Sequence, residues 1–180
     1  YSYGLDAIHI LRLQQSFVKQ AEKLGLYDKR VINLDFHTIP HFGDESELEE
    51  HWAGARNKTM KGALTLFAQD AASKLILYTA ADILRKEADD QVLNFLSYWK
   101  HMARGIMPTF VFDAKFTTYA HLSELNQQGI KFITLRRRGK RMLAGINKLS
   151  PWKRIKIPHG KRKYPNPMVH ESFISLDDYD

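Results

Sequence analysis

The sequence predicts an α/β fold in which a mixed sheet carries helices on its faces. Five short apolar segments with strand character alternate with three segments of helical periodicity. Two of the strand segments are joined by a very short connection, which allows only a hairpin and therefore an antiparallel pair. The later strands are separated by helices, and such crossovers imply parallel pairing. Antiparallel and parallel pairs in one sheet make it mixed.

The first segment, residues 5–26, has apolar residues at helical spacing, among them Leu11, Val18 and Ala21. Gly25 supplies a stop signal at its end. We assign residues 1–30 to an N-terminal helical segment that packs on the core as the end of an upstream element. The chain begins without Met, so we expect an excised or processed piece.

The next stretch predicts a strand followed by a hairpin. Residues 31–42 form the first strand, and the acidic stretch 43–54 is predicted to be a loop. Residues 62–70 form the second strand and residues 74–80 the third. The Ala71-Ala72-Ser73 turn between them is short, so these two strands are expected to be antiparallel.

Two helices and two strands follow. Asp89 or Asp90 can cap a helix that runs to about residue 104. Its buried stripe comprises Val92, Phe95, Leu96 and Trp99. The fourth strand, residues 109–112, follows Pro108. The remaining elements are a helix through residue 128, capped by Thr117 or Thr118 and stopped by Gly129, and a fifth strand at 130–135.

Beyond Arg141 the periodic pattern weakens. Residues 150–164 are expected to form one or two irregular strands, and residues 169–176 another. We therefore divide the chain into the N-terminal helical segment, a sheet domain at residues 31–143 and a β-rich tail at residues 144–180.

Positive charge is concentrated in one part of the chain. The net charge is +7, and 13 of the 27 Lys and Arg residues lie between Lys131 and Lys163, a stretch without Asp or Glu. The basic residues from Arg136 to Arg141 come directly after a predicted strand, where a tail is not expected, so we predict a nucleic acid partner. A solvated basic tail is the alternative. Lys58 and Lys61 precede the second strand and either contact a phosphate backbone or form an exposed basic loop.

The composition excludes several other classes. Cysteine is absent, which excludes disulfides, thiolate zinc sites and a cysteine nucleophile, and fits a reducing compartment. No run of about 18 apolar residues predicts a membrane span, and the N-terminus lacks a signal-peptide pattern. We expect no membrane partner. Neither a phosphate-cradling Gly-rich loop nor a Ser nucleophile motif is present.

Two strands each deliver one aspartate, Asp35 in the first and Asp113 at the end of the fourth. Both strands are apolar, and we expect both carboxylates to be buried among large hydrophobic residues. Burying a carboxylate costs several kcal/mol unless something pairs with it, so a shared cation is expected. Two carboxylates holding Mg²⁺ beside a basic surface suit phosphodiester chemistry. The alternative is that each aspartate merely caps a turn.

Other residues offer competing or supplementary chemistry. Asp35, His37 and His41 are a rival set of ligands for a first-row metal. A third carboxylate would normally complete a magnesium site, and the candidates after Asp113 are Glu124, Glu171, Asp177, Asp178 and Asp180. Trp152 can stack on an extruded base, although a core or hinge role is favoured.

Two segments resemble the DDE transposases of bacterial insertion sequences. Residues 34–43, Leu-Asp-Phe-His-Thr-Ile-Pro-His-Phe-Gly, resemble the segment of that family with its first aspartate. Phe112-Asp113-Ala114-Lys115-Phe116, a helix and then the stretch 128–136 resemble the segment with the second. The resemblance covers about residues 31–143, and the order and spacing of the motifs carry it.

The resemblance implies a ribonuclease-H-like fold, Mg²⁺ or Mn²⁺, and cut-and-paste DNA transposition. Asp35 and Asp113 match the first two catalytic and metal-binding positions. The family's third residue is a glutamate on a helix, often after a β-rich insertion, and no such helix follows Asp113. Residues 144–180 then correspond to the start of that insertion. The chain is accordingly expected to be a fragment of a longer transposase, or a decayed or repurposed one.

We therefore predict a transposase catalytic core that cleaves and transfers DNA strands at transposon ends, if the full-length protein supplies the third carboxylate. The partner is double-stranded DNA, at transposon ends and target. A homodimer and a cytoplasmic, nucleoid-associated location in a bacterium are expected from the resemblance. The predicted DNA-binding residues are Lys58, Lys61, Lys115, Arg136, Arg137, Arg138, Lys140 and Arg141. The alternatives are a non-catalytic DNA-binding derivative and a related metal-dependent nuclease.

Overall fold

The computed structural model describes residues 6–43, 47–102, 106–136, 139–146, 148–157, 166–176 and 179. The chain divides into two compact units, one of residues 1–135 with 178–180 and one of residues 136–177. Each is described by itself. The three-part division expected from the sequence stays a prediction. In the described part of the chain no helix has the length and apolar character needed to cross a bilayer.

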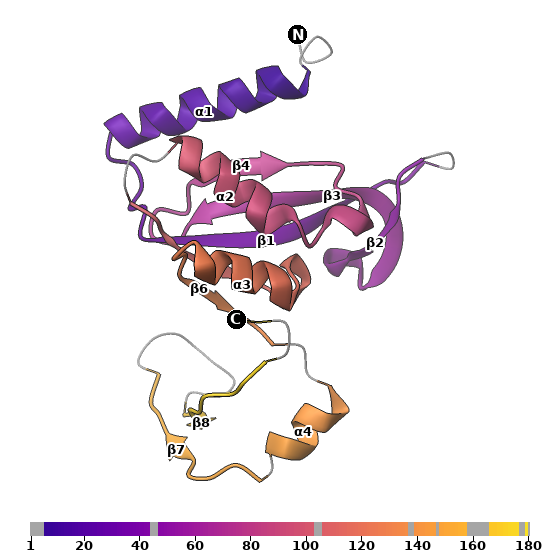
Figure 1. Cartoon of the computed structure of the whole chain (residues 1–180). Helices are drawn as coiled ribbons and strands as arrows, with labels where there is room; N and C mark the ends of the chain where they lie inside the picture. The colour runs from indigo at the N-terminus through magenta and orange to yellow at the C-terminus, as the bar shows by residue number, and fades with distance from the viewer. Residues whose placement is uncertain are drawn as a thin grey trace. The chain divides into compact units, whose positions relative to one another are not determined.

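The first unit is built on a six-stranded mixed sheet (Figure 1). Its strands are β1 (Val31–Pro40), β2 (Glu50–Ala53), β3 (Lys58–Asp70), β4 (Ile76–Ala80), β5 (Thr109–Phe112) and β6 (Phe132–Thr134). The order is β2-β3-β1-β5-β6, and β4 also pairs with β3. β3 is antiparallel to β1, β2 and β4, whereas β5 is parallel to β1 and β6. The predicted mixed α/β fold class is confirmed.

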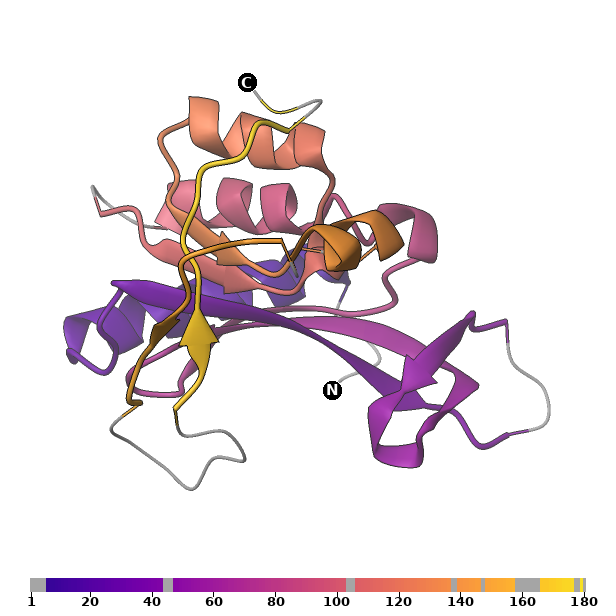
Figure 2. The same cartoon turned by 90° about the horizontal axis from the view of Figure 1, so that it is seen from below.

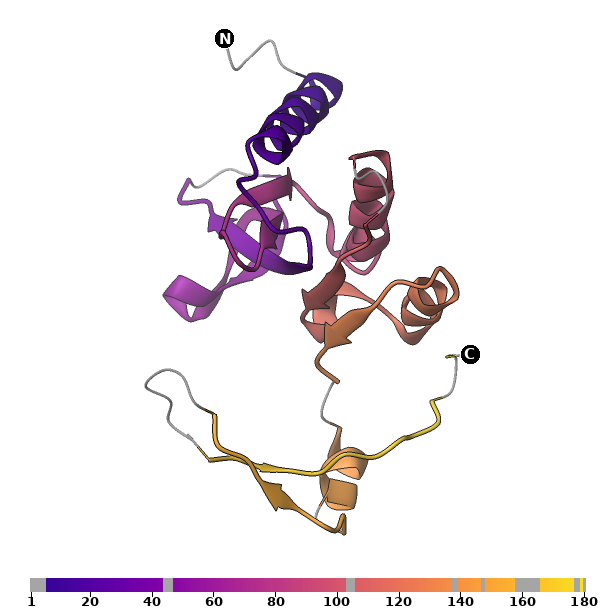
Figure 3. The same ribbon diagram turned by 90° about the vertical axis from the view of Figure 1, so that its left-hand side faces the viewer.

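Helices α1 (Ala7–Lys23), α2 (Gln91–Met102) and α3 (Tyr119–Gln127) contribute to one buried cluster with the sheet (Figure 3). Ile32 and Leu34 of β1 lie in it with Phe95 of α2 and Leu125 of α3. Because side chains of a strand alternate, the β1 residues of the other parity, including Asp35, project from the opposite face. The capping prediction for Thr118 is confirmed, since its side chain accepts a hydrogen bond from the His121 N–H.

α1 also protects an edge of the sheet. The Gln14 amide nitrogen donates to the Thr79 carbonyl (3.1 Å), and its amide oxygen accepts from the Thr79 N–H (2.7 Å). One side chain thus replaces a neighbouring strand at the outer edge of β4, where unpaired backbone groups could otherwise pair with another chain. Gly25, predicted as the helix stop, has a positive φ of 66°.

Strand β2 is where the predicted organisation of the sheet is wrong. It lies inside the stretch 43–54 that was expected to be a loop, and β3 begins at Lys58 rather than at residue 62. β2 alternates exposed Glu50 and Trp52 with buried His51 and Ala53. Two of these four residues are polar or charged, so the strand lacks an apolar run and forms because β3 supplies its hydrogen-bonding partner.

The second unit contains α4 (Lys140–Ile146), β7 (Lys153–Arg154) and β8 (Met168–Val169). β7 and β8 form an antiparallel pair (Figure 2). The expected strand at 169–176 is wrong beyond Val169, since residues 170–176 form no strand. Within the expected stretch 150–164, β7 is one short strand, and part of that stretch lies outside the described residues. α4 was not predicted. Trp152 is locally fixed, because its indole N–H donates to the Leu149 carbonyl (2.8 Å) and its ring contacts His170.

Candidate functional site

The register of β1 and β5 brings the two predicted aspartates together. The strands are parallel, and Leu34 is paired with Phe112. Asp35 and Asp113 each come next, so they lie on neighbouring strands at the same level and, by alternation, on the same face. Neighbouring strands of a sheet lie about 4.8 Å apart. Asp113 keeps an extended backbone (φ −76°, ψ 156°) before the 3₁₀ turn η4 (Ala114–Phe116).

Both carboxylates are exposed, and the expectation that they are buried is wrong. Leu34 and Phe112 are buried, but the alternation that buries them turns the next side chain away from the core. The cost of burying a charge therefore does not call for a cation here. Electrostatic repulsion favours a cation instead, since two like charges side by side on adjacent strands repel each other. A cation between them would remove that repulsion.

The donor set fits a hard divalent cation. Mg²⁺ prefers oxygen ligands and is commonly held by one or two carboxylates, the rest of its shell being water or phosphate oxygens. Asp35 and Asp113 accept no hydrogen bond from other described residues, so their oxygens remain available. Among the described residues, no group of three His, Asp or Glu side chains is placed to hold a metal ion.

That finding bears on the third ligand and on the rival histidine site. Glu124 lies exposed on α3, where it accepts a hydrogen bond from the Gln128 side chain (3.0 Å). Glu171 belongs to the second unit, and Asp177, Asp178 and Asp180 lie outside the described residues. Asp35, His37 and His41 do not form a three-ligand group. The His37 ring lies 6.4 Å from the Phe67 ring centroid instead.

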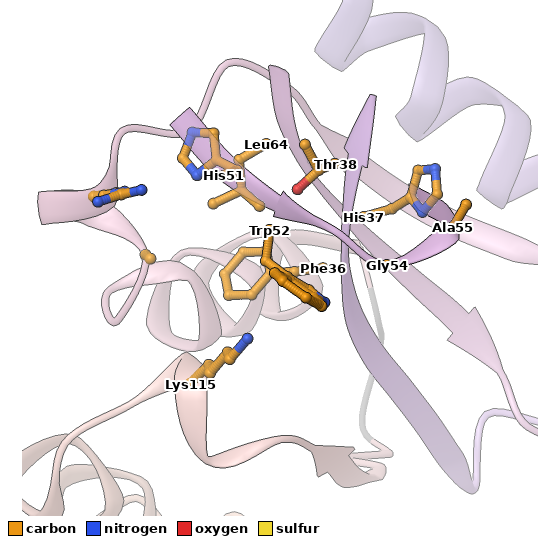
Figure 4. A pocket seen from close by; sticks show the side chains of 11 residues that line it. Phe36, His37, Thr38, His51, Trp52, Gly54, Ala55, Leu64 and Lys115 are labelled. Carbon is orange, nitrogen blue, oxygen red and sulfur yellow. The ribbon is translucent and has the colours of Figure 1, made fainter. Parts of the chain in front are cut away.

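A pocket of about 360 Å³ is lined in part by residues that lie close in sequence to the two aspartates (Figure 4). Phe36 follows Asp35 directly, and Lys115 lies two residues after Asp113. The pocket is lined by residues of β1, β2, β3 and the turns after β2, before α2 and after β5: Phe36, His37, Thr38, His51, Trp52, Gly54, Ala55, Leu64, Arg85, Ala88 and Lys115. None of these described residues is acidic, and four have cationic or imidazole side chains.

Two contacts fix the polar wall of this pocket. The Arg85 guanidinium donates to the Glu50 carbonyl, and the Arg85 backbone N–H donates to the Glu49 carboxylate (2.8 Å). These bonds tie the turn η3 (Arg85–Glu87) to the start of β2. His51 is buried, and this burial lowers its pKa; Arg85 lowers it further, whereas Glu49 raises it. The His51 imidazole is consequently neutral at pH 7.

The predicted DNA-binding residues fall into separate groups. Lys58 and Lys61 lie at the exposed start of β3, and Lys115 lines the pocket. Arg136 and Lys140 are exposed in the second unit. Arg137, Arg138 and the side chain of Arg141 lie outside what the structure describes. Trp52, His51 and Arg85 were not predicted as site residues from the sequence; the alternation of exposed and buried residues in β2 is the signal that could have found Trp52.

Comparisons with known proteins give structural similarity without sequence similarity. No protein-family model matches the chain. No curated protein matches its sequence either. The fold is similar to a piggyBac transposase in a synaptic complex with hairpin DNA, at 16% identity and a TM-score of 0.48, over 78% of this chain and 32% of that one. It is also similar to the catalytic domain of Mos1 mariner transposase, at 11% identity and a TM-score of 0.40, over 80% and 72%.

A Mos1 mariner paired-end complex with Mn is a further similar structure, at 10% identity and a TM-score of 0.38, over 79% of this chain and 49% of that one. The chain therefore spans about a third of the piggyBac transposase chain and about half of the chain in this Mos1 complex.

Proposed function

We propose that this chain is part of the catalytic core of a DDE-type DNA transposase of the bacterial insertion-sequence kind, which cleaves and transfers DNA strands at transposon ends. The observation that carries the proposal is the matched position of Asp35 and Asp113 on parallel neighbouring strands. Exposure leaves both carboxylates accessible to a metal ion and to a phosphate. The resemblance of the two aspartate segments to that family supports it.

In this proposal Asp35 and Asp113 hold Mg²⁺ or Mn²⁺ through carboxylate oxygens. When bound, such an ion activates an oxygen nucleophile and stabilises the leaving oxygen of a phosphodiester. The rigid sheet fixes the spacing of the two carboxylates, since each follows a buried, paired residue. A third acidic ligand would come from outside the described residues, from the full-length protein.

The partner in this proposal is double-stranded DNA. Exposed cations at Lys58 and Lys61 and the basic stretch from Arg136 supply the charge that phosphate backbones bind, each contact adding to the salt dependence of affinity. A homodimer and a nucleoid-associated location belong to the same proposal.

The test compares Asp35→Asn and Asp113→Asn in the full-length protein with Asp82→Asn. Asp82 is an exposed aspartate with a positive φ of 56°, a conformation that Asn also tolerates. We expect both site variants to lose Mn²⁺ binding, followed by electron paramagnetic resonance, and cleavage of DNA bearing the element's terminal inverted repeats. DNA binding should survive in all three, and Asp82→Asn should behave as wild type.

Three other outcomes would contradict this assignment or favour an alternative function. Cleavage at the wild-type rate by either site variant would contradict the assignment of Asp35 and Asp113. A wild-type protein that binds DNA but neither binds Mn²⁺ nor cleaves would favour the non-catalytic DNA-binding derivative. Metal-dependent cleavage without joining to target DNA would favour the nuclease.

A further inference from the structure

The pocket between β1, β2 and η4 has a planar aromatic wall and a cationic rim. We propose that it binds one unpaired nucleotide of a DNA strand, with the base stacked on Trp52 and a flanking phosphate held by Lys115. This inference rests on the proposed function for DNA as the partner, but it does not need catalysis or a metal ion.

Trp52 supplies the stacking surface. Its backbone is held by the pairing of β2 with β3, where Trp52 lies opposite Thr59. Its side chain is nevertheless 52% exposed, while its neighbours His51 and Ala53 are buried. An indole held by a strand yet open to solvent is a costly surface to leave in water, and it offers a face on which any base can stack.

Lys115 supplies the charge. In Figure 4 its ammonium group points from η4 toward Trp52 and Phe36. It forms no ion pair or hydrogen bond with the described residues. Arg85 also lines the pocket and is anchored through the Glu50 carbonyl. Since no acidic residue lines the pocket within the described chain, an anionic group is favoured there over a cationic or neutral one.

The size and the remaining polar group suit a nucleotide. A volume of about 360 Å³ is at the lower end for small-molecule sites, which excludes a folded peptide and admits a base with its sugar. His51 is buried and its lowered pKa keeps it neutral, so its ring can exchange hydrogen bonds with a base edge. Sequence preference should be weak, because stacking does the binding.

The position of the pocket explains why the nucleotide should be unpaired. Phe36 follows Asp35 on β1, and successive side chains of a strand point to opposite faces. Phe36 and Thr38 of the pocket point away from the face of Asp35, whereas His37 shares that face, so the pocket borders β1 directly beside the position of Asp35. A DNA strand that passes the carboxylates can place a neighbouring base in the pocket only if this base has left its partner, which costs a few kcal/mol unless it is already unpaired.

The experiment measures fluorescence anisotropy of a labelled blunt duplex and of the same duplex with one overhanging nucleotide, in EDTA. We expect the wild-type protein to bind the overhang about 5- to 160-fold more tightly, the range that stacking of one base supplies. Trp52→Ala should abolish this preference and leave blunt-duplex affinity within about twofold, whereas Trp52→Phe should retain most of it because an aromatic face remains. Circular dichroism checks that both variants fold.

Lys115→Gln gives an independent arm, with Lys86→Gln as its control, since Lys86 is an exposed neighbour of Arg85 outside the pocket. Lys115→Gln should weaken overhang binding and lower the slope of log affinity against log salt by about 1. Lys86→Gln should keep the overhang preference.

The proposal is overturned if the wild-type protein shows no overhang preference, or if a folded Trp52→Ala variant keeps it. Competition by an equal concentration of free deoxynucleoside monophosphate would also overturn it, because the pocket would then serve a free nucleotide. EDTA removes divalent metal throughout, so these results are independent of the cleavage test. A protein that fails to cleave DNA can still prefer the overhang, and a protein without that preference can still cleave.

Discussion

Asp70 and the pair Asp35 and Asp113 are carboxylates on or next to strands of one sheet, but their surroundings are opposite. Asp70 is fully buried, and one of its oxygens accepts hydrogen bonds from the N–H and the hydroxyl of Ser73, both at 2.7 Å. Asp35 and Asp113 are exposed and accept none from the described residues. The comparison separates a carboxylate that holds a turn together from two that are left available for a ligand.

The largest expected effect comes from Asp70. Asp70→Ala should lower the free energy of unfolding by about 2 to 3 kcal/mol, because Ser73 loses its charged acceptor in the turn between β3 and β4. Urea denaturation measures this, with Asp35→Ala as the matched change at an exposed site, expected within about 0.5 kcal/mol of wild type. Equal losses at the two positions would break the comparison.

The same contrast should appear in acid. Burial raises the pKa of Asp70, but hydrogen bonding by Ser73 together with the backbone N–H groups of Asp28 and Lys29 outweighs it, and the net pKa lies below its ordinary value. Its contribution to stability is therefore present above the unfolded pKa, near 4, and is lost as the pH falls through the lower folded pKa. The stability difference between wild type and Asp70→Asn, measured by urea denaturation from pH 6 downward, should shrink below about pH 4.

A smaller pH effect is expected for the buried His51 of the pocket. Its pKa is lowered by burial and by Arg85, against the opposing charge of Glu49. Below the unfolded pKa of about 6.5 the unfolded chain binds more protons than the folded one, so stability should fall as the pH decreases through that value. His51→Gln should flatten this slope, which urea denaturation at several pH values measures. An unchanged slope in His51→Gln would mean that other groups cause it.

The sheet was largely predictable because its strands carry local signals. The strand 109–112 and the cap at Thr118 were placed correctly from an apolar run and a capping residue. β2 was missed because half of its side chains are polar and because it forms by pairing with Lys58–Lys61 of β3. Strand pairing of this kind depends on tertiary context rather than on the residues of the strand alone.

The candidate site was predictable in its residues but not in its energetics. The sequence showed that Asp35 lies in one apolar strand and Asp113 at the end of another, and the parallel register places them on neighbouring strands. It did not show on which face each side chain lies, because a shift of one residue reverses burial. The pocket could not be predicted, since Trp52, Arg85 and Lys115 are brought together only by the folded sheet.

The smallest expected effect tests the electrostatic side of the comparison. Without metal, Asp35→Asn should raise the free energy of unfolding by about 0.2 to 1 kcal/mol, because it removes a like-charge pair on adjacent strands. Saturating Mn²⁺ should stabilise the wild type in proportion to the logarithm of its concentration over the dissociation constant, and should not stabilise the variant. Urea denaturation with and without Mn²⁺ measures both terms, and Asp82→Asn controls for the loss of a charge elsewhere. If Asp35→Asn instead destabilises the metal-free protein as Asp70→Ala does, then Asp35 has a structural partner, and the distinction between the two kinds of aspartate fails.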